Sequence, residues 1–137
     1  MTVLFVSMLG IHLEEHGIYS DLIHALLSSG HKVILVDDQN TRNIEKQHKN
    51  LRIVPIGISI NKFKNRYFKG FLSLVLEFVI LFVMKFTIRQ ESIDVMLYST
   101  PPIMYTHLLK QCKRRYRCKT FLMLKDIFPQ NAVDERI

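Results

Sequence analysis

The chain has 137 residues, with 19 lysines and arginines against 12 aspartates and glutamates, and a net charge of +7. Hydrophobic residues make up 48% of it and charged residues 23%, which excludes a disordered or fibrous chain and fits one globular domain. The surplus of positive charge predicts an anionic partner: a phosphorylated ligand, a nucleic acid or an anionic lipid headgroup.

The two cysteines, Cys112 and Cys118, are too few for a disulfide framework. No second Cys/His pair at metal-ligand spacing accompanies them, so we expect no metal site. A reducing, cytoplasmic setting is the default for such a chain. The apolar start "MTVLFVSMLG" lacks the basic region of a signal peptide and is followed by a polar segment, so we interpret it as a first buried strand.

The first part of the chain alternates strand patterns with a helix pattern. The apolar runs "TVLFVS", "HKVILVDD" and "LRIVPIG" predict three buried strands. Between the first two, "IYSDLIHALLSSG" predicts a helix that ends at Gly30, where a C-cap glycine belongs. The polar residues 39–50 predict a loop or a short irregular helix. The inward face of the helix is expected to comprise Ile18, Leu22, Ala25 and Leu26.

A long apolar helix is expected from about Tyr67 to Gln90. From Phe71 to Met84 its only polar residues are Ser73 and Glu77. Fourteen residues of helix span about 21 Å, less than the roughly 30 Å of a bilayer's hydrocarbon core. Three interpretations stay open. The helix is buried between the sheet and a neighbouring element, or the segment Phe71–Ile88 and its flanking lysines and arginines contact the surface of the cytoplasmic membrane. A helix that spans the membrane comes third, because an extension to Ile88 includes Lys85 and places Glu77 deep in lipid.

The last part of the chain continues the alternation. It predicts a strand "DVMLYS", a helix that opens at Pro101–Pro102 with Ser99 or Thr100 as N-cap, and a strand "KTFLML". Strands that alternate with helices and are apolar on both faces predict an α/β fold, a parallel sheet with helices on both faces. Ligands bind such sheets beyond the carboxyl ends of the strands. This rule selects four candidate site segments: 7–17, 37–38, 99–102 and 125–131.

Three motifs suggest functions that their context does not favour. The string "HLEEH", His12 to His16, matches a zinc-peptidase pattern but lies between glycines in a loop, so a solvated loop is the preferred interpretation. Asp37 or Asp38 stands where a dinucleotide-binding fold holds the ribose, yet the glycine fingerprint is missing. The basic run "KQCKRRYRCK" has only Tyr116 interleaved, which favours a helix C-terminus, with membrane-facing charge second; we expect no nucleic-acid partner.

Two strand ends carry groups that suit a sugar or a phosphate. Ser99 and Thr100 end a strand before a helix whose free amide groups would point into the ligand crevice. Helix capping alone also explains a serine and a threonine there. Lys125 and Asp126 follow the last strand. Asp126 is a candidate to orient or deprotonate a hydroxyl nucleophile, or it is a turn residue that binds local backbone amides.

Taken in chain order, "VLFVS", "HGIYSDLIHALLSSGHKVILV", the long apolar helix, "IDVMLYSTPPI" and "KTFLMLKDIFPQNAVD" resemble the N-terminal half of bacterial glycosyltransferase family 4 enzymes, which build capsular and O-antigen polysaccharides. The resemblance covers residues 2–134, and "STPP" and "KDIFPQNAVD" are its most specific parts. It implies a GT-B fold, two Rossmann-like domains facing across a cleft. In that fold the N-terminal domain binds the acceptor, often a lipid-linked sugar, and the C-terminal domain binds the nucleotide-sugar donor.

The resemblance also implies roles for individual residues. The Gly17 loop would line the cleft near the donor phosphates, and Ser99 and Thr100 would border the acceptor crevice. Lys125 and Asp126 correspond to the basic and acidic residues that end the fifth strand, with Asp126 near the attacking hydroxyl as the candidate catalytic residue. Transfer in this family proceeds with retention and needs no metal or cofactor, since the nucleotide sugar is a substrate.

Residues 1–137 would then form the acceptor-side Rossmann-like domain, without the donor domain. The family has paired glycines where this chain has His16–Gly17, which weakens the case for close approach to a phosphate. After Asp134 the family continues with a Leu-Gly-type sequence that "ERI" does not resemble. We therefore expect a truncated transferase that is inactive as an isolated chain and peripheral on the inner face of the cell membrane.

Two other functions stay open. A non-catalytic, membrane-associated subunit would recruit a separate chain that carries the donor domain. A small nucleotide-binding protein would use Asp37 or Asp38 and would bind dinucleotides, which the transferase interpretation does not expect.

Overall fold

A computed structural model describes residues 1–7, 11, 13–37, 48–56, 66–99 and 106–123, with the side chains of 66–74 left aside. Within this part, strands and helices alternate along the chain. The strands are β1 (Thr2–Val6), β2 (Lys32–Asp37), β3 (Leu51–Pro55), β4 (Val95–Ser99) and β5 (Lys119–Met123), and the helices are α1 (Ile18–Ser28), α3 (Arg66–Thr87) and α4 (Thr106–Tyr116).

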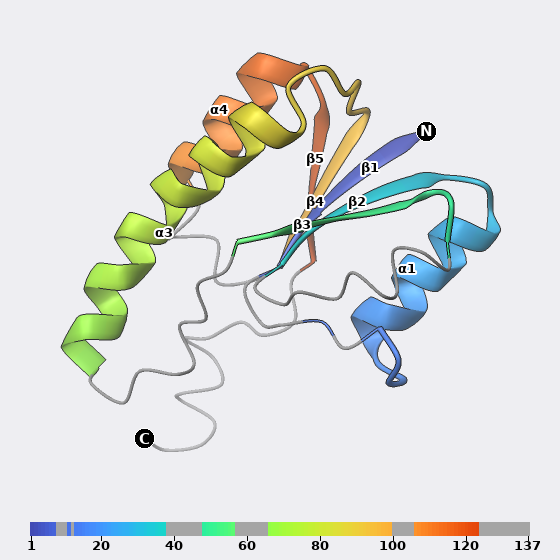
Figure 1. The fold of residues 1–137 in the computed structure, drawn as a ribbon, viewed down its shortest axis with the longest axis horizontal. Coiled ribbons are helices and arrows are strands. Elements are labelled where there is room, and N and C mark those ends of the chain that lie inside the picture. The colour runs from blue at the N-terminus through green and yellow to red at the C-terminus, as the bar shows by residue number, and fades with distance from the viewer. Residues whose placement is uncertain (8–10, 12, 38–47, 57–65, 100–105, 124–137) are drawn as a thin grey trace.

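The five strands form one parallel sheet in the order β3-β2-β1-β4-β5 (Figure 1). Helix α1 lies on one face of the sheet, and α3 and α4 lie on the other. Because both faces of the central strands are covered, Val3 to Val6 and Val33 to Val36 are all buried, and each strand is a continuous apolar run. The predicted α/β fold, a Rossmann-like parallel sheet with helices on both faces, is confirmed.

The alternation of side chains along each strand divides the core into two layers. Leu4 and Val6 of β1 pack on the side of α3 and α4, together with Ile80 and Met84 of α3. Phe5 packs on the opposite side with Ile23 of α1. The buried residues of the layer beside α3 and α4 come from both halves of the chain, whereas those of the layer beside α1 come from the first half.

Helix α1 has nearly the predicted bounds, and its predicted inward face is right only in part, since Leu26 packs against the core and Leu22 is half-buried. Tyr19 and Ile23 are its buried apolar residues, whereas Ile18 is exposed. Among the other residues expected inside, Ala25 is also exposed. The apolar residues of this short helix cover more than one side, and the sheet selects the side on which the Tyr19 ring reaches Phe5, at 5.6 Å between ring centroids.

The end of α1 is a Schellman motif, as the glycine at position 30 suggests. The amide of Gly30 donates to the carbonyl of Leu27 and that of His31 donates to the carbonyl of Leu26, both at 3.0 Å. Gly30 has a φ of +77°, a left-handed conformation that residues with a Cβ rarely adopt. The predicted C-cap is confirmed.

Helix α3 is long but not apolar throughout, which corrects the expectation of one long apolar helix. Its inward side buries Leu76, Ile80 and Met84 at a spacing of four residues, and Ile88, directly after the helix, continues the series. Glu77 is buried among them as a polar group, and Lys85 is exposed on the outside. The described residues contain no helix whose length and apolar character would allow it to cross a membrane.

The amino-terminal edge of the sheet is joined to the end of α3 by ion pairs. Glu91 receives hydrogen bonds from Lys32 of β2 and from Arg52 of β3, each at 2.8 Å. A second nitrogen of Arg52 donates to the carbonyl of Thr87, the last residue of α3. These contacts fix where α3 ends relative to two strands.

Two predicted features lie outside the described residues: most of the polar segment 39–50, and the helix start at Pro101–Pro102. The run "KQCKRRYRCK" does end a helix, since Lys113, Arg114 and Arg115 form the last turn of α4. Positive charges there interact favourably with the negative end of the helix dipole. That prediction is confirmed.

Candidate functional site

The strands are parallel, so their carboxyl ends all lie at the same edge of the sheet. The strand order reverses between β1 and β4. From β1 the chain adds β2 and β3 on one side, and then crosses to add β4 and β5 on the other. In open α/β sheets this reversal leaves a crevice that binds ligands. The last residues paired between β1 and β4 are Val6 and Tyr98, so Ser7 and Ser99 follow at the crevice. Both serines are buried, and they are the polar residues that follow the apolar core at the ends of these two strands.

The structure places Ser99, one of the predicted substrate-binding residues, at the carboxyl end of β4, beside this reversal of strand order. Its exposed fraction is only 5%, so it presents little surface to a ligand. It is better suited to hold neighbouring backbone in place than to contact the ligand directly. Ser7, which adjoins it across the strand pair, is held by a 3.0 Å hydrogen bond from its amide to the carbonyl of Val36. Thr100, Lys125 and Asp126, the other predicted residues of this edge, lie outside the described residues.

Asp37 ends β2 and has a structural role that the sequence did not reveal. It is buried, and its Oδ2 accepts a 2.9 Å hydrogen bond from the amide of Ile11. This bond fastens the segment after β1 to the neighbouring strand. In dinucleotide-binding folds the corresponding carboxylate hydrogen-bonds the ribose hydroxyls and must be accessible. Asp37 is not accessible, which counts against the nucleotide-binding alternative; Asp38 lies outside the described residues.

Gly17 lies directly before α1 and is exposed to solvent. Its carbonyl accepts hydrogen bonds from the amide of Asp21 at 2.8 Å and the hydroxyl of Ser20 at 2.9 Å. Its φ of −170° is extended backbone that any residue adopts, so the turn does not require glycine. Asp21 places a negative charge in the first turn, which stabilises the helix and disfavours a second anion there.

The "HLEEH" motif does not have the geometry of a zinc site in its described part. Leu13 and Glu14 lie in a turn, and His16 is an exposed residue 3.4 Å from Asp21. A peptidase site of this type needs both histidines on one helix face. Within the part of the chain that the structure describes, no cluster of three or more His, Cys, Asp or Glu residues could hold a metal ion.

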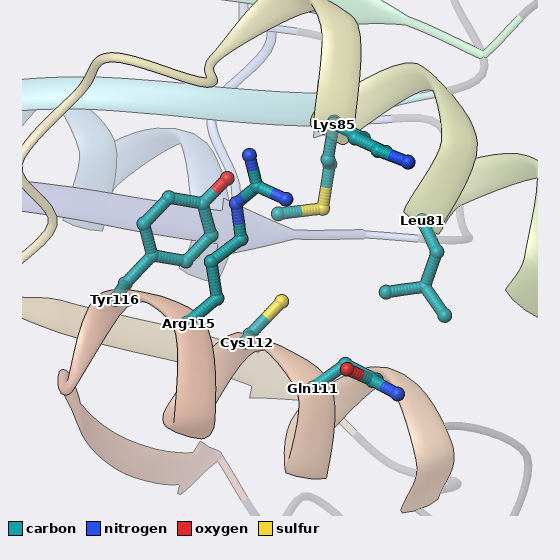
Figure 2. Close-up of a pocket in the computed structure, with 7 residues that line it drawn as sticks. Leu81, Lys85, Gln111, Cys112, Arg115 and Tyr116 are labelled. Carbon is teal, nitrogen blue, oxygen red and sulfur yellow. The ribbon is translucent and has the colours of Figure 1, made fainter.

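A hollow lies in the groove between α3 and α4, on one face of the sheet and away from the carboxyl ends of β1 and β4. Figure 2 shows Arg115 and Tyr116 extending from α4 toward α3, with the phenol oxygen beside the guanidinium. The hollow has a volume of about 260 Å³. The sequence gives no sign of this hollow, because its two walls are separate helices that meet only in the folded chain. It is lined by Leu81, Met84, Lys85, Gln111, Cys112, Arg115 and Tyr116.

The ionisable groups in this groove have distinct environments. Burial raises the pKa of the Cys112 thiol to about 12, so that thiol is neutral and unreactive at physiological pH. Burial also raises the pKa of the Tyr116 phenol, against the opposing effect of the Arg115 charge. The guanidinium carbon of Arg115 lies 5.7 Å from the centre of the Tyr116 ring, within reach of a cation–π interaction. The Tyr116 ring thus contacts the guanidinium of Arg115. Among the described residues no carboxylate forms an ion pair with Arg115.

The fold has a counterpart among solved structures. The crystal structure of the glycotransferase of kitacinnamycin matches with a TM-score of 0.65 and 13% sequence identity, over 98% of this chain and 33% of that protein. No protein-family profile matches the chain, and neither does any curated protein sequence. The chain thus shares the fold of the part of that structure that it matches, and it spans a third of the length of that structural neighbour.

Proposed function

We propose that this chain is the acceptor-binding domain of a sugar transferase. The fold likeness to a glycotransferase supports this, because the match covers nearly the whole chain and only a third of the neighbour. A transferase of this architecture needs a partner domain for its donor, so the proposed activity belongs to two domains acting together. We further propose that the complete enzyme transfers a sugar from a nucleotide sugar to a lipid-linked acceptor in the synthesis of a surface polysaccharide. This part of the proposal rests on the sequence resemblance.

The observation that carries the proposal is the reversal of strand order between β1 and β4, where sheets of this type have their ligand crevice. Ser7 and Ser99 lie at the strand ends there, and the Asp37–Ile11 hydrogen bond ties the segment after β1 to β2. The carboxyl edge of the sheet is thus preorganised by buried contacts, as a binding site requires. By the resemblance, Thr100 and Lys125 would bind the acceptor sugar there. Asp126 would orient the attacking hydroxyl or accept its proton.

Amide chemical shifts, measured by NMR on the full chain, test which ligand binds this edge. A short-chain polyprenyl diphosphate sugar should shift the amides of Ser7, Ile11 and Ser99. A nucleotide sugar and a dinucleotide should shift them little. If the dinucleotide moved these amides while the lipid-linked sugar left them unchanged, the acceptor assignment would be wrong.

A variant at the end of β4 sharpens this test. Ser99→Ala should weaken acceptor binding by at most about fivefold, since the buried hydroxyl can support the site through no more than one hydrogen bond, worth about 1 kcal/mol. Ser28→Ala is the matched control, because Ser28 is exposed at the far end of α1 and its hydroxyl bonds only within the helix. Equal effects of the two substitutions would contradict binding at the crevice.

A further inference from the structure

The outer side of α3 carries three exposed phenylalanines one turn apart. Phe78, Phe82 and Phe86 have exposed fractions of 61%, 64% and 67%. The rings of Phe82 and Phe86 lie 4.7 Å apart, so they form a continuous surface, called here the phenylalanine ridge together with Phe78. Large aromatic side chains in such a row are costly to leave in water. The ridge therefore indicates a surface that is covered in use.

The ridge is bordered by positive charge. On one side Lys85 and Arg115 line the groove between α3 and α4. At the end of α3, Phe86 lines another hollow with Arg89 and with the ion pair of Arg52 and Glu91, so Arg89 supplies the unbalanced positive charge there. Helix α4 contributes further cations and has no acidic residue at all. An apolar row between cations is the pattern of a helix that lies at a membrane surface, its apolar side among the acyl chains and its cations on anionic headgroups.

The groove supplies what a headgroup phosphate needs. Arg115 and Lys85 offer charged donors, Gln111 and Tyr116 offer neutral ones, and none of the described lining residues is acidic. The nearby carboxyl groups are engaged elsewhere: that of Glu77 with the amide of Leu108, and that of Glu91 with Lys32 and Arg52. A volume of about 260 Å³ is below the roughly 300–1,000 Å³ of drug-sized ligand sites, and suits a headgroup rather than a longer chain.

We propose that the groove between α3 and α4 binds the phosphate of an anionic phospholipid, with Arg115 and Lys85 as its charged ligands, while the phenylalanine ridge enters the membrane interface beside it. The proposal commits to a lipid surface because the apolar ridge and the cationic groove adjoin on one side of the molecule. It goes beyond the proposed transferase function and does not depend on it, since the crevice between β1 and β4 lies elsewhere in the fold.

Co-sedimentation of the full chain with vesicles tests this proposal. Binding is expected to vesicles of phosphatidylcholine mixed with phosphatidylglycerol, and not to phosphatidylcholine alone. Lys85→Gln with Arg115→Gln should weaken binding about 30-fold, because each cation at a surface contributes about a fivefold effect. Lys113→Gln with Arg114→Gln removes the same charge from α4 outside the groove, and should weaken binding clearly less than the groove pair, because these side chains would not contact the bound phosphate.

Two further measurements distinguish binding to a lipid surface from binding of a free phosphate compound. Phe82→Ser should abolish vesicle binding while leaving thermal unfolding unchanged, because that side chain is largely exposed. Inorganic phosphate and glycerol phosphate should not release the protein from vesicles. Equal losses in the two charge variants, equal binding to both kinds of vesicle, or release by inorganic phosphate would overturn the proposal. Each of these outcomes leaves the acceptor-binding test unaffected.

Discussion

The side chain of Glu77 on α3 accepts a hydrogen bond from the backbone amide of Leu108, in the first turn of α4. A buried carboxyl group thus caps a helix that is 31 positions away in the sequence. The first amides of a helix have no partner within it, and an acidic group there also suits the helix dipole. The polar residue that interrupts the apolar side of α3 is therefore part of the contact between two helices.

Removing this cap should destabilise the protein. Glu77→Ala leaves the Leu108 amide buried without an acceptor, and should lower the free energy of unfolding by about 1–3 kcal/mol. Glu77→Gln keeps an acceptor oxygen and should cost less. Urea denaturation measures both, with the exposed Glu14→Ala as control. If alanine and glutamine cost the same at position 77, the hydrogen bond does not stabilise the helix contact.

The contribution of Glu91 should depend on pH. The hydrogen bond from Lys32, aided by Arg52, lowers the pKa of its carboxyl group below the ordinary 4.5. A lowered pKa in the folded state stabilises the protein above pH 4.5, and this stabilisation is lost as the pH falls through the folded-state value.

The comparison to make is between the native chain and Glu91→Gln, by urea denaturation at several pH values. At neutral pH the variant should be less stable by about 1 kcal/mol at most, because both cations are partly exposed to solvent. The difference should shrink toward zero as the pH falls well below 4.5. A difference that stayed constant over this range would contradict the ion-pair explanation.

Replacing Gly30 should strain the end of α1. Its φ of +77° costs a residue with a Cβ about 1–2 kcal/mol, although no atom lies within 4 Å of the added methyl. Gly30→Ala should therefore lower the free energy of unfolding by that amount. Gly17→Ala is the matched control, since its backbone is extended and the added Cβ would meet Ser20 at an ordinary 3.5 Å. Equal costs at both positions would exclude backbone strain as the cause.

The buried thiol of Cys112 should resist modification. With a pKa of about 12 instead of 9.0, its thiolate population near neutral pH is about a thousandfold lower than that of a free cysteine. Maleimide labelling followed by peptide mass spectrometry, which separates Cys112 from Cys118, should show slow reaction in the native protein. In denaturant the labelling should become fast. Rapid native labelling at Cys112 would mean that the groove opens or that the thiol is not buried.

Local sequence signals predicted the order of the elements well. The strands are recognisable because buried parallel strands are apolar at every position, and Gly30 marks the end of α1 because only the local backbone decides its conformation. The same order selected the carboxyl ends of the strands as candidate site segments, and Ser99 lies at that edge. The binding roles of Gly17, Ser99, Thr100 and Lys125 and the catalytic role of Asp126 stay predictions.

The sequence by itself determined the alternating strands and helices and the strongly positive charge of this protein, because periodicity and composition are local properties. Only the tertiary structure decided which side of α1 faces the sheet, that Glu77 caps α4, and that Asp37 holds Ile11. These outcomes depend on contacts between elements distant in the chain. The same reason explains the groove of Lys85 and Arg115, whose walls meet only when two helices pack on one face of the sheet.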